Sequence, residues 1–216
     1  RKLWADIMKN RYGVKDKKAL LCRFHTQTAG SSLQAHQIDN NVVRTTMQAT
    51  AAILGGTQSL HTNSRDEALS LPTEDSAKLA LRTQQVLAHE TGLVDVVDPL
   101  AGSYYVESLT QSIESKTLEL IKNIDDLGGA ILAIENNFQQ NQISNTAFEY
   151  QKAIENKEQI IVGLNKYEDV ENTTIPIQTI DKEAIDDQLQ RLQKFKSDRD
   201  QDNVVISLRK LEASLN

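Results

Sequence analysis

The sequence is poor in the features that build disulfides, membrane spans and nucleic-acid interfaces. Its 216 residues include one cysteine, Cys22, which excludes an internal disulfide and favours a reducing compartment, so we predict a cytoplasmic protein. No apolar run approaches the roughly 20 residues of a membrane span, and no signal peptide opens the chain. The net charge of −6 argues against a nucleic-acid partner, because no broad cationic surface is available.

Three apolar segments are predicted to be strands, and polar residues follow each of them. The segments are residues 19–24, 57–60 and 93–97. His25, His61 and Asp98 follow them, with spacings of 36 and 37 residues. The gaps between the strands carry apolar residues at helical spacing, which predicts a helix after each of the first two strands.

A regular alternation of strand and helix predicts parallel strands joined by crossover helices. A (β/α)8 TIM barrel repeats this unit eight times in about 250 residues. The predicted fold class is therefore α/β, with residues 1–110 forming the C-terminal three βα units of such a barrel. Residues before Arg1 are expected to supply the other units. Residues 111–167 are predicted to be helices around the barrel, and residues 168–216 a loop and a helical hairpin.

The barrel prediction also indicates where chemistry would take place. In barrel enzymes the functional groups lie on the loops after the strands, which here carry His25, Gln27, His61 and Asn63. The sequence has no P-loop or dinucleotide fingerprint, no acidic pair at a fixed spacing, and no histidine spacing typical of a metal site. A rim of neutral hydrogen-bonding groups suits the orientation of a polar ligand and the exclusion of water more than it suits hydrolysis.

Each candidate also has a purely structural alternative. His25 is equally suited to bonding a neighbouring loop, and Asn63 to satisfying a turn. Gln58 suits a polar plug inside the barrel. Glu67 suits the start of a helix, where the helix dipole favours a carboxylate.

Several blocks follow one another in an order that is typical of one enzyme family. They are FHTQTAG at 24–30, NNVVRT at 40–45, GTQSLHTN at 56–63, DEAL at 66–69, LPT at 71–73, ALRTQ at 80–84 and VDPLAGSYYVE at 97–107. These blocks resemble the adenosylcobalamin-dependent acyl-CoA mutases of the methylmalonyl-CoA mutase family, in the large or catalytic subunit. The likeness is dense from about Tyr12 to Thr110 and looser as far as Tyr167.

The resemblance implies a radical carbon-skeleton isomerase that acts on an acyl-CoA, with methylmalonyl-CoA to succinyl-CoA as the leading reaction. In this family the acyl-CoA threads the barrel, and adenosylcobalamin lies across its C-terminal rim, held by a separate domain or subunit. The resemblance therefore implies an oligomer with a cobalamin-binding partner. No metal site is predicted in this chain, and the segment alone is expected to be inactive. Because the cofactor carries the difficult chemistry, the protein positions the reactants and excludes water.

The same resemblance implies roles for individual residues. His25 and Gln27 would line the cavity between the acyl group and the corrin. Asn63 and Glu67 would bond the adenosyl ribose. The remaining positions are Gly30, Ala68 and Leu71, which would face the corrin, and Gln58, which would lie near the acyl-CoA.

One position departs from the better-known family members. Ser31 stands where the better-known methylmalonyl-CoA mutases have a tryptophan. In addition, the family's substrate-binding arginine, tyrosine and histidine would lie before Arg1. Isobutyryl-, ethylmalonyl- and 2-hydroxyisobutyryl-CoA therefore stay alternative substrates. A non-catalytic scaffold or assembly subunit with a mutase-like surface is the rival from a different class.

Overall fold

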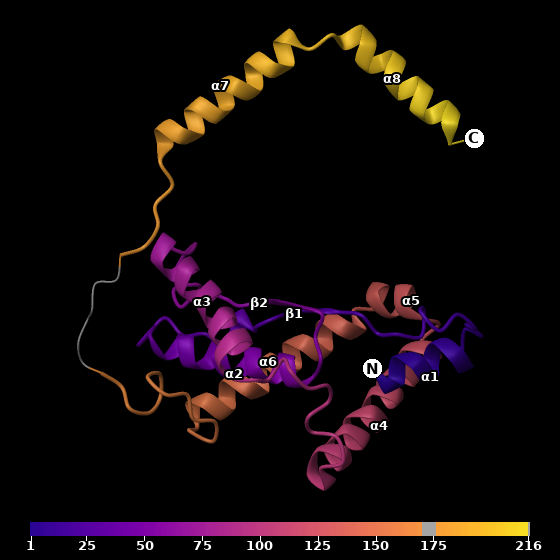
Figure 1. Cartoon of the computed structure of the whole chain (residues 1–216), viewed down its shortest axis with the longest axis vertical. Coiled ribbons are helices and arrows are strands. Elements are labelled where there is room, and N and C mark those ends of the chain that lie inside the picture. The colour runs from indigo at the N-terminus through magenta and orange to yellow at the C-terminus, as the bar shows by residue number, and fades with distance from the viewer. Residues whose placement is uncertain (170–175, 216) are drawn as a thin grey trace. The chain divides into compact units, whose positions relative to one another are not determined.

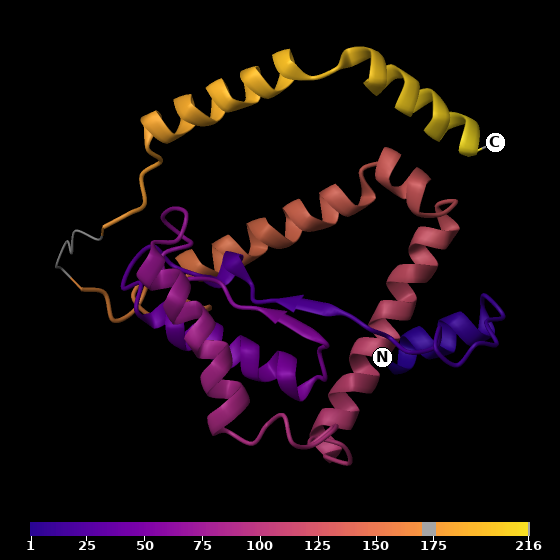
Figure 2. The ribbon, with the colours of Figure 1, turned by 45° about the horizontal axis from the view of Figure 1, so that its top comes forward.

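Two short parallel strands lie beside helices in the first part of the chain (Figures 1 and 2). The computed structural model describes residues 1–169 and 176–215, and the chain divides into a first part, residues 1–177, and a second part from residue 178. The elements of the first part are α1 (Lys2–Asn10), β1 (His25–Gln27), the short 3-10 helix η1 (Gly30–Ser32), α2 (Asn40–Leu54), β2 (Ser59–His61), α3 (Glu74–Glu90), α4 (Tyr104–Asp126), α5 (Ala130–Glu135) and α6 (Phe138–Glu155). The second part contains α7 (Lys182–Asp198) and α8 (Gln201–Ser214).

The two strands pair in parallel, with His25 beside Ser59 and Gln27 beside His61. Helix α2 connects them, so the predicted strand–helix–strand unit is confirmed. Helices with a small parallel sheet are compatible with an α/β fold, while the TIM barrel itself stays a prediction.

Helix α3 is held to the carboxyl end of β2 by side-chain hydrogen bonds. Gln84 Nε2 donates to the Leu60 carbonyl (3.1 Å) and to Thr62 Oγ1 (3.0 Å). Thr62 Oγ1 in turn donates to the Ala80 carbonyl (2.8 Å). These bonds fix α3 beside the segment that follows β2.

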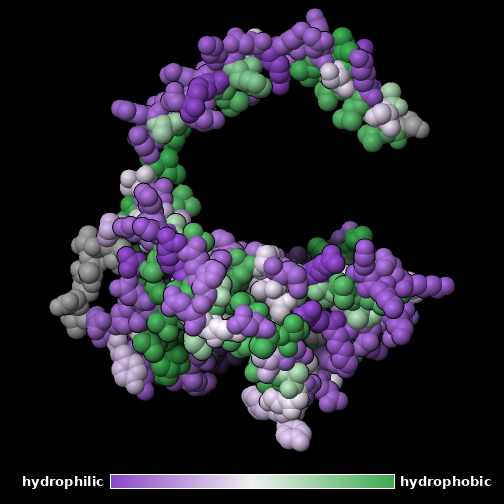
Figure 3. Space-filling model, viewed as in Figure 1, coloured by the Kyte–Doolittle hydropathy of each residue, from purple (hydrophilic) through white to green (hydrophobic). Residues whose placement is uncertain are grey.

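The interior of the first part is rich in polar groups. The buried apolar side chains of the described residues are few, and Figure 3 shows many apolar side chains at the surface between polar ones. The largest fully buried side chains are Asn41, Asn63 and Asp66. Buried polar groups need hydrogen-bond partners, so hydrogen bonds and apolar packing both determine the arrangement of these segments. The buried apolar residues are Leu33, Ile38, Ala49, Leu87 and Ala133.

Helices α2 and α3 are bounded by residues that are typical of helix ends. Thr73 is the N-cap of α3, and its side chain accepts a hydrogen bond from the Ser76 N–H (3.3 Å). Gly92 follows α3 with a φ of +69°, as expected for a glycine at a helix C-terminus. Gly56, with a φ of +75°, likewise follows the end of α2.

The first two strands lie later in the sequence than predicted. The strand predicted over residues 19–24 is wrong, because residues 17–20 form a turn and β1 begins at His25. The second strand begins at Ser59 instead of residue 57. His25 and His61 therefore lie within the strands, not after them. The shift arises because the hydrogen-bonded register, rather than the apolar run, decides which residues are extended.

The third predicted strand, residues 93–97, is also wrong. These residues form a turn and a bend, in which the Asp95 N–H donates to the Gly92 carbonyl (3.2 Å). Val97 is 91% exposed. An apolar run becomes a strand only where a neighbouring strand supplies hydrogen bonds along its length, and this segment bonds within its own turn instead.

The helices after residue 100 agree with their predicted patterns. Residues 111–167 were predicted to be helical, and α4 begins a little earlier, at Tyr104, with Gly128 and Gly129 after its end. Arg11 binds Asp125 with both guanidinium nitrogens (2.8 and 2.9 Å), which ties the segment after α1 to α4. The apolar run at 160–164 is not helical and takes part in one isolated bridge, from Val162 to Lys166.

The second part consists of the two predicted helices. Their N-caps are Asp181, which accepts from the Glu183 N–H (2.9 Å), and Asp200, which accepts from the Asn203 N–H (3.0 Å). The loop predicted before them lies mostly at residues 170–175, outside the described residues. The domain boundaries at 110 and 167 stay predictions. Over residues 1–169 and 176–215, no helix combines the length and apolar character that crossing a bilayer requires.

Candidate functional site

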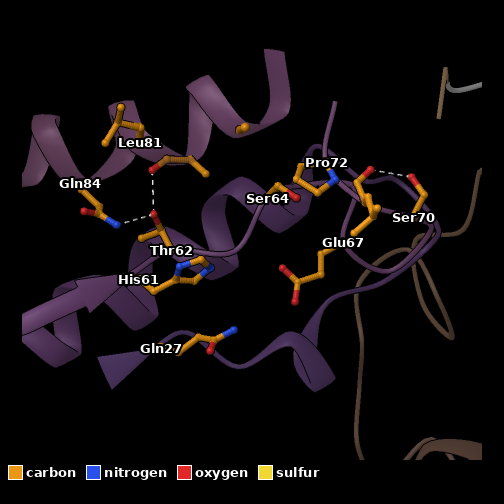
Figure 4. A pocket seen from close by; sticks show the side chains of 12 residues that line it. Gln27, His61, Thr62, Ser64, Glu67, Ser70, Pro72, Leu81 and Gln84 are labelled. Atoms are coloured by element: carbon orange, nitrogen blue, oxygen red, sulfur yellow. Dashed lines mark hydrogen bonds between the residues drawn. The ribbon is translucent and has the colours of Figure 1, made fainter. Parts of the chain in front are cut away.

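A pocket opens at the carboxyl ends of β1 and β2, between the segment after β2 and helix α3 (Figure 4). Its volume is about 680 Å³. Gln27, His61 and Glu67 project toward the same open space in Figure 4. The lining residues are Gln27, His61, Thr62, Ser64, Glu67, Ser70, Leu71, Pro72, Ala77, Ala80, Leu81 and Gln84.

One face of the strand pair carries a row of polar side chains. Side chains alternate along a strand, so the register places His25, Gln27, Ser59 and His61 on the same face. His25 Nδ1 lies 2.7 Å from Ser59 Oγ. His25 is absent from the pocket lining, whereas Gln27 and His61 belong to it. The expectation that the two histidine-bearing strands are parallel neighbours is confirmed, with Gln27 next to the pocket and His25 farther from it.

Asn63 is buried beside this pocket with an unsatisfied donor. It is 2% exposed, and its Oδ1 accepts a hydrogen bond from Gln27 Nε2 (3.3 Å). Its backbone N–H donates to Thr28 Oγ1 (2.9 Å), which fixes the backbone after β2. Asn63 Nδ2 has no hydrogen-bond partner among the described residues. A buried donor without a partner costs roughly 1–3 kcal/mol, so this NH2 group is suited to a ligand acceptor.

Gly30 brings a second loop against Asn63 and Glu67. A Cβ at Gly30 would lie 3.0 Å from Glu67 Oε1 and 3.1 Å from Asn63 Nδ2. The absence of a side chain therefore permits this approach. The structure thus brings together three of the predicted site residues, with an amide donor and a carboxylate acceptor side by side.

The other predicted site residues lie at different distances from this group. Leu71 lines the pocket and is exposed, whereas Ala68 is exposed but does not line it. Gln58 lines a separate pocket of about 430 Å³. Its Oε1 accepts from the Phe24 N–H (2.8 Å), and its Nε2 donates to the Gly56 carbonyl (3.0 Å). The structure therefore does not bring Gln58 to the pocket of Gln27 and Glu67.

Asp66 organises the loop, although nothing in the sequence assigns it a role. It is 1% exposed, and its Oδ2 accepts from the Thr73 N–H (3.1 Å) and Thr73 Oγ1 (3.3 Å). Burial alone would raise the pKa of Asp66, but the neighbouring Ser64 and Ser76 hydroxyls and the Thr73 N–H outweigh it and lower the pKa. Asp66 thus anchors the loop that carries Glu67 to the start of α3. The position of Thr73 just before a helical pattern indicates an N-cap, but nothing in the sequence indicates that Asp66, seven residues earlier, accepts its hydrogen bonds.

The chemistry that these groups offer is polar recognition. Amides, an imidazole and one carboxylate surround the pocket. In the described part of the chain, no group of three or more His, Cys, Asp or Glu side chains is placed to hold a metal ion. The arrangement fits a ligand that presents hydroxyl groups to Asn63 and Glu67.

Comparisons with known proteins agree with the sequence blocks. The family model described as methylmalonyl-CoA mutase matches residues 1–216. The chain belongs to the methylmalonyl-CoA mutase family. It is 46% identical over 202 residues to the methylmalonyl-CoA mutase of Cereibacter sphaeroides, a match that covers 93% of this chain and 28% of the relative. It is also 42% identical over 214 residues to the 2-hydroxyisobutanoyl-CoA mutase large subunit of Aquincola tertiaricarbonis, covering 99% of this chain and 38% of that subunit.

The mutase family also includes animal relatives of this chain. The human mitochondrial methylmalonyl-CoA mutase is 41% identical over 202 residues, covering 93% of this chain and 27% of the human protein. The chain thus spans between about a quarter and two fifths of the length of these mutases. The resemblance identified from the sequence blocks is confirmed.

Proposed function

We propose that this chain forms part of the active site of an adenosylcobalamin-dependent acyl-CoA mutase, with methylmalonyl-CoA to succinyl-CoA as the leading reaction. The observation that carries the proposal is the buried, unpartnered Asn63 Nδ2 next to Glu67, at the point where Gly30 approaches both. Adenosylcobalamin, when bound, supplies the radical that starts the carbon-skeleton rearrangement.

Asn63 and Glu67 offer the two hydrogen-bonding roles that a ribose diol needs. The Asn63 NH2 donates to one hydroxyl oxygen, and the Glu67 carboxylate accepts from a hydroxyl. The Asn63 Oδ1 is already bonded to Gln27 Nε2 (3.3 Å), which orients the amide with its NH2 group free. The residues present therefore fit the adenosyl group of the cofactor.

Gln27 and His25 provide the wall between the cofactor and the acyl group. Both lie on the polar face of the strand pair, and the Ser59 hydroxyl holds the His25 ring (2.7 Å). Their role is to position the acyl group and to exclude water from it. Gly30, Ala68 and Leu71 face the corrin, and Gln58 lies toward the acyl-CoA.

The partners follow from the same proposal. The chain acts on an acyl-CoA together with a cobalamin-binding domain or subunit, in an oligomer. The relative from Aquincola tertiaricarbonis is called a large subunit, which supports a separate partner chain. The cytoplasmic location stays a prediction.

The acyl group is the least determined part of the proposal. Relatives at 42% and 46% identity carry the names of two different mutases, one for 2-hydroxyisobutanoyl-CoA and one for methylmalonyl-CoA. Ser31, in the loop at Gly30, departs from the tryptophan of the better-known methylmalonyl-CoA mutases. Assays with both substrates, and with isobutyryl- and ethylmalonyl-CoA, decide among them.

The ribose contacts can be tested in a mutase preparation that contains this chain. The double variant Asn63→Ala, Glu67→Ala removes both groups, and we expect affinity for adenosylcobalamin to fall by about tenfold or more. Hydroxocobalamin has no adenosyl group, so its affinity should change little. Equilibrium titration of both cobalamins measures the ratio.

The matched control is the exposed pair Asn156 and Glu158, in which Asn156 Nδ2 donates to Glu158 Oε1 (3.5 Å) away from the pocket. The double variant Asn156→Ala, Glu158→Ala should leave both affinities unchanged. An equal loss for the two cobalamins in the Asn63, Glu67 variant would contradict the ribose contacts. Normal adenosylcobalamin binding without turnover of any acyl-CoA would favour the non-catalytic scaffold.

A further inference from the structure

The side chain of Asn41, on the first turn of α2, is fully buried, and its Oδ1 and Nδ2 atoms are both bonded. Its Oδ1 accepts from the Gln34 N–H (3.0 Å) and from Arg44 Nη1 (2.8 Å). Its Nδ2 donates to the carbonyls of Gln34 and Arg65 (2.8 Å each). One amide therefore joins α2, the segment before it and the loop after β2. A fully satisfied buried amide fixes the geometry of the groups that it joins.

The Arg65 carbonyl is the bond that connects Asn41 to the candidate site. Arg65 lies two residues after Asn63 and two residues before Glu67, so its peptide group lies in the middle of the ribose-binding segment. The Arg65 side chain also pairs with Asp39 (2.5 Å), but Asp39 is 81% exposed. Exposed ion pairs contribute little, so the buried Asn41 bond is the stronger link to α2.

Arg44 holds the Asn41 amide in its orientation from the other side. Its Nη1 binds Asn41 Oδ1, and its Nη2 donates to the Val162 carbonyl (2.8 Å). The loop containing Val162 is itself ordered by Asn165, whose Nδ2 donates to the carbonyls of Ile154 (2.9 Å) and Gln159 (2.8 Å). A segment more than a hundred residues after Asn41 thus supports the same amide.

We propose that Asn41 is a positioning residue for the adenosyl group, acting through the Arg65 carbonyl on Asn63 and Glu67, and that Arg44 supports it. The inference rests on the proposed function, because it assigns Asn63 and Glu67 to the ribose. The bond from Asn41 ties the ribose-binding segment to α2, while Asp66 ties the same segment to α3 through Thr73. The spacing between Asn63 and Glu67 is therefore set by two helices, neither of which carries the two residues themselves.

The test is Asn41→Asp in a mutase preparation that contains this chain. A carboxylate keeps the size of the amide but cannot donate to the Gln34 and Arg65 carbonyls, so the loop loses its attachment. We expect affinity for adenosylcobalamin to fall by about tenfold while affinity for hydroxocobalamin changes much less. Leu87→Ala, which removes a buried side chain outside the pocket lining, is the control for general destabilisation and should leave the ratio of the two affinities unchanged.

A double-mutant cycle with the Asn63→Ala, Glu67→Ala variant distinguishes positioning from a general structural role. If Asn41 acts through Asn63 and Glu67, Asn41→Asp should add little to the loss of adenosylcobalamin affinity that this variant already causes. Full additivity of the two losses would overturn the proposal. So would a loss of the same size for both cobalamins.

A milder variant keeps the proposal testable if Asn41→Asp does not fold. Arg44→Lys preserves the charge but cannot bind Asn41 and the Val162 carbonyl together, and we expect a smaller loss in the same ratio. An unchanged ratio in a folded Arg44→Lys protein, with Asn41→Asp unfolded, contradicts the positioning role. If the Asn63→Ala, Glu67→Ala variant alone leaves the ratio unchanged, the ribose assignment fails, whereas failure of the Asn41 and Arg44 variants alone removes only this inference.

Discussion

The loop between β2 and α3 and the helices of the second part differ in how far their hydrogen bonds reach. In the loop, Asn63 bonds to Gln27 of β1 and to Thr28, which follows that strand. The Arg65 carbonyl bonds to Asn41 of α2. In the second part, the bonds of Asp181, Ser197 and Asp200 reach no more than three residues along the chain. A regular helix needs only local bonds, whereas the geometry of a binding loop requires partners that are distant in the sequence.

The largest expected difference between the two regions is in the stability lost when a helical leucine is replaced by alanine. Leu87 of α3 is 4% exposed, whereas Leu189 of α7 is 49% exposed. Leu87→Ala should lower the free energy of unfolding by about 3 kcal/mol, because it leaves a cavity. Leu189→Ala should change it by about 0.5 kcal/mol or less.

Urea denaturation of the two variants, followed by circular dichroism, measures this difference. Similar losses for both would mean that Leu189 is buried in the protein in solution. The comparison between the two regions would then no longer hold.

The next effect concerns the buried carboxylate of Asp66. Asp66→Asn should cost about 2 kcal/mol, since it removes the charge that strengthens the bonds from Thr73 and places an amide NH2 group in a buried site. Asp187→Asn, in an exposed pair with Arg191, should cost about 0.5 kcal/mol or less. Because the pKa of Asp66 is lowered in the folded state, its stabilisation is complete above its unfolded pKa. That stabilisation is lost as the pH falls from the unfolded pKa through the folded one.

Thermal unfolding of the parent and of Asp66→Asn between about pH 6 and pH 3 tests this sign. The difference in melting temperature between them should shrink as the solution is acidified. A difference that grows in acid would mean that the folded pKa of Asp66 is raised instead.

Of the substitutions in the first part, Gly30→Ala is expected to have the smallest effect on stability. Gly30→Ala places a Cβ 3.0 Å from Glu67 Oε1 and 3.1 Å from Asn63 Nδ2, so these side chains must move by a few tenths of an ångström. We expect a loss of about 1 kcal/mol in stability and a clear loss of adenosylcobalamin affinity. Gly55→Ala, at the end of α2, is the matched control. Unchanged cofactor affinity in Gly30→Ala would show that the approach of the two loops is not required.

The sequence predicted those features whose physical cause is local. Helical periodicity located α2, α3 and α4, and Thr73 was recognisable as an N-cap from its own neighbours. The strands were displaced because their position depends on the pairing of His25 with Ser59 and of Gln27 with His61. The segment at 93–97 had the composition of a strand, but composition does not supply a neighbouring strand.

The candidate site was predictable in part from position and in part from the family resemblance. Position after the predicted strands selected Gln27, His61 and Asn63, whereas Glu67 and the ribose-binding role came from the resemblance. The structure brings Asn63 and Glu67 together at Gly30. Asp66 and Asn41 belonged to the same blocks and received no role, because nothing in the sequence indicates that Asp66 accepts from Thr73 or that Asn41 donates to Arg65. Long-range partners of buried polar groups are visible only in three dimensions.

The loop at 160–167 is attached through main-chain oxygens, since Arg44 binds the Val162 carbonyl (2.8 Å) and Gln37 Nε2 binds the Tyr167 carbonyl (2.7 Å). A carbonyl is present whatever the side chain, so neither attachment depends on the side chain of Val162 or Tyr167. The absence of a side chain does matter at Gly163, because its φ is +81° and a Cβ there would lie 2.9 Å from the Gln37 side chain. The attachment of this loop therefore depends on the path of its backbone, which the Asn165 side chain helps to hold.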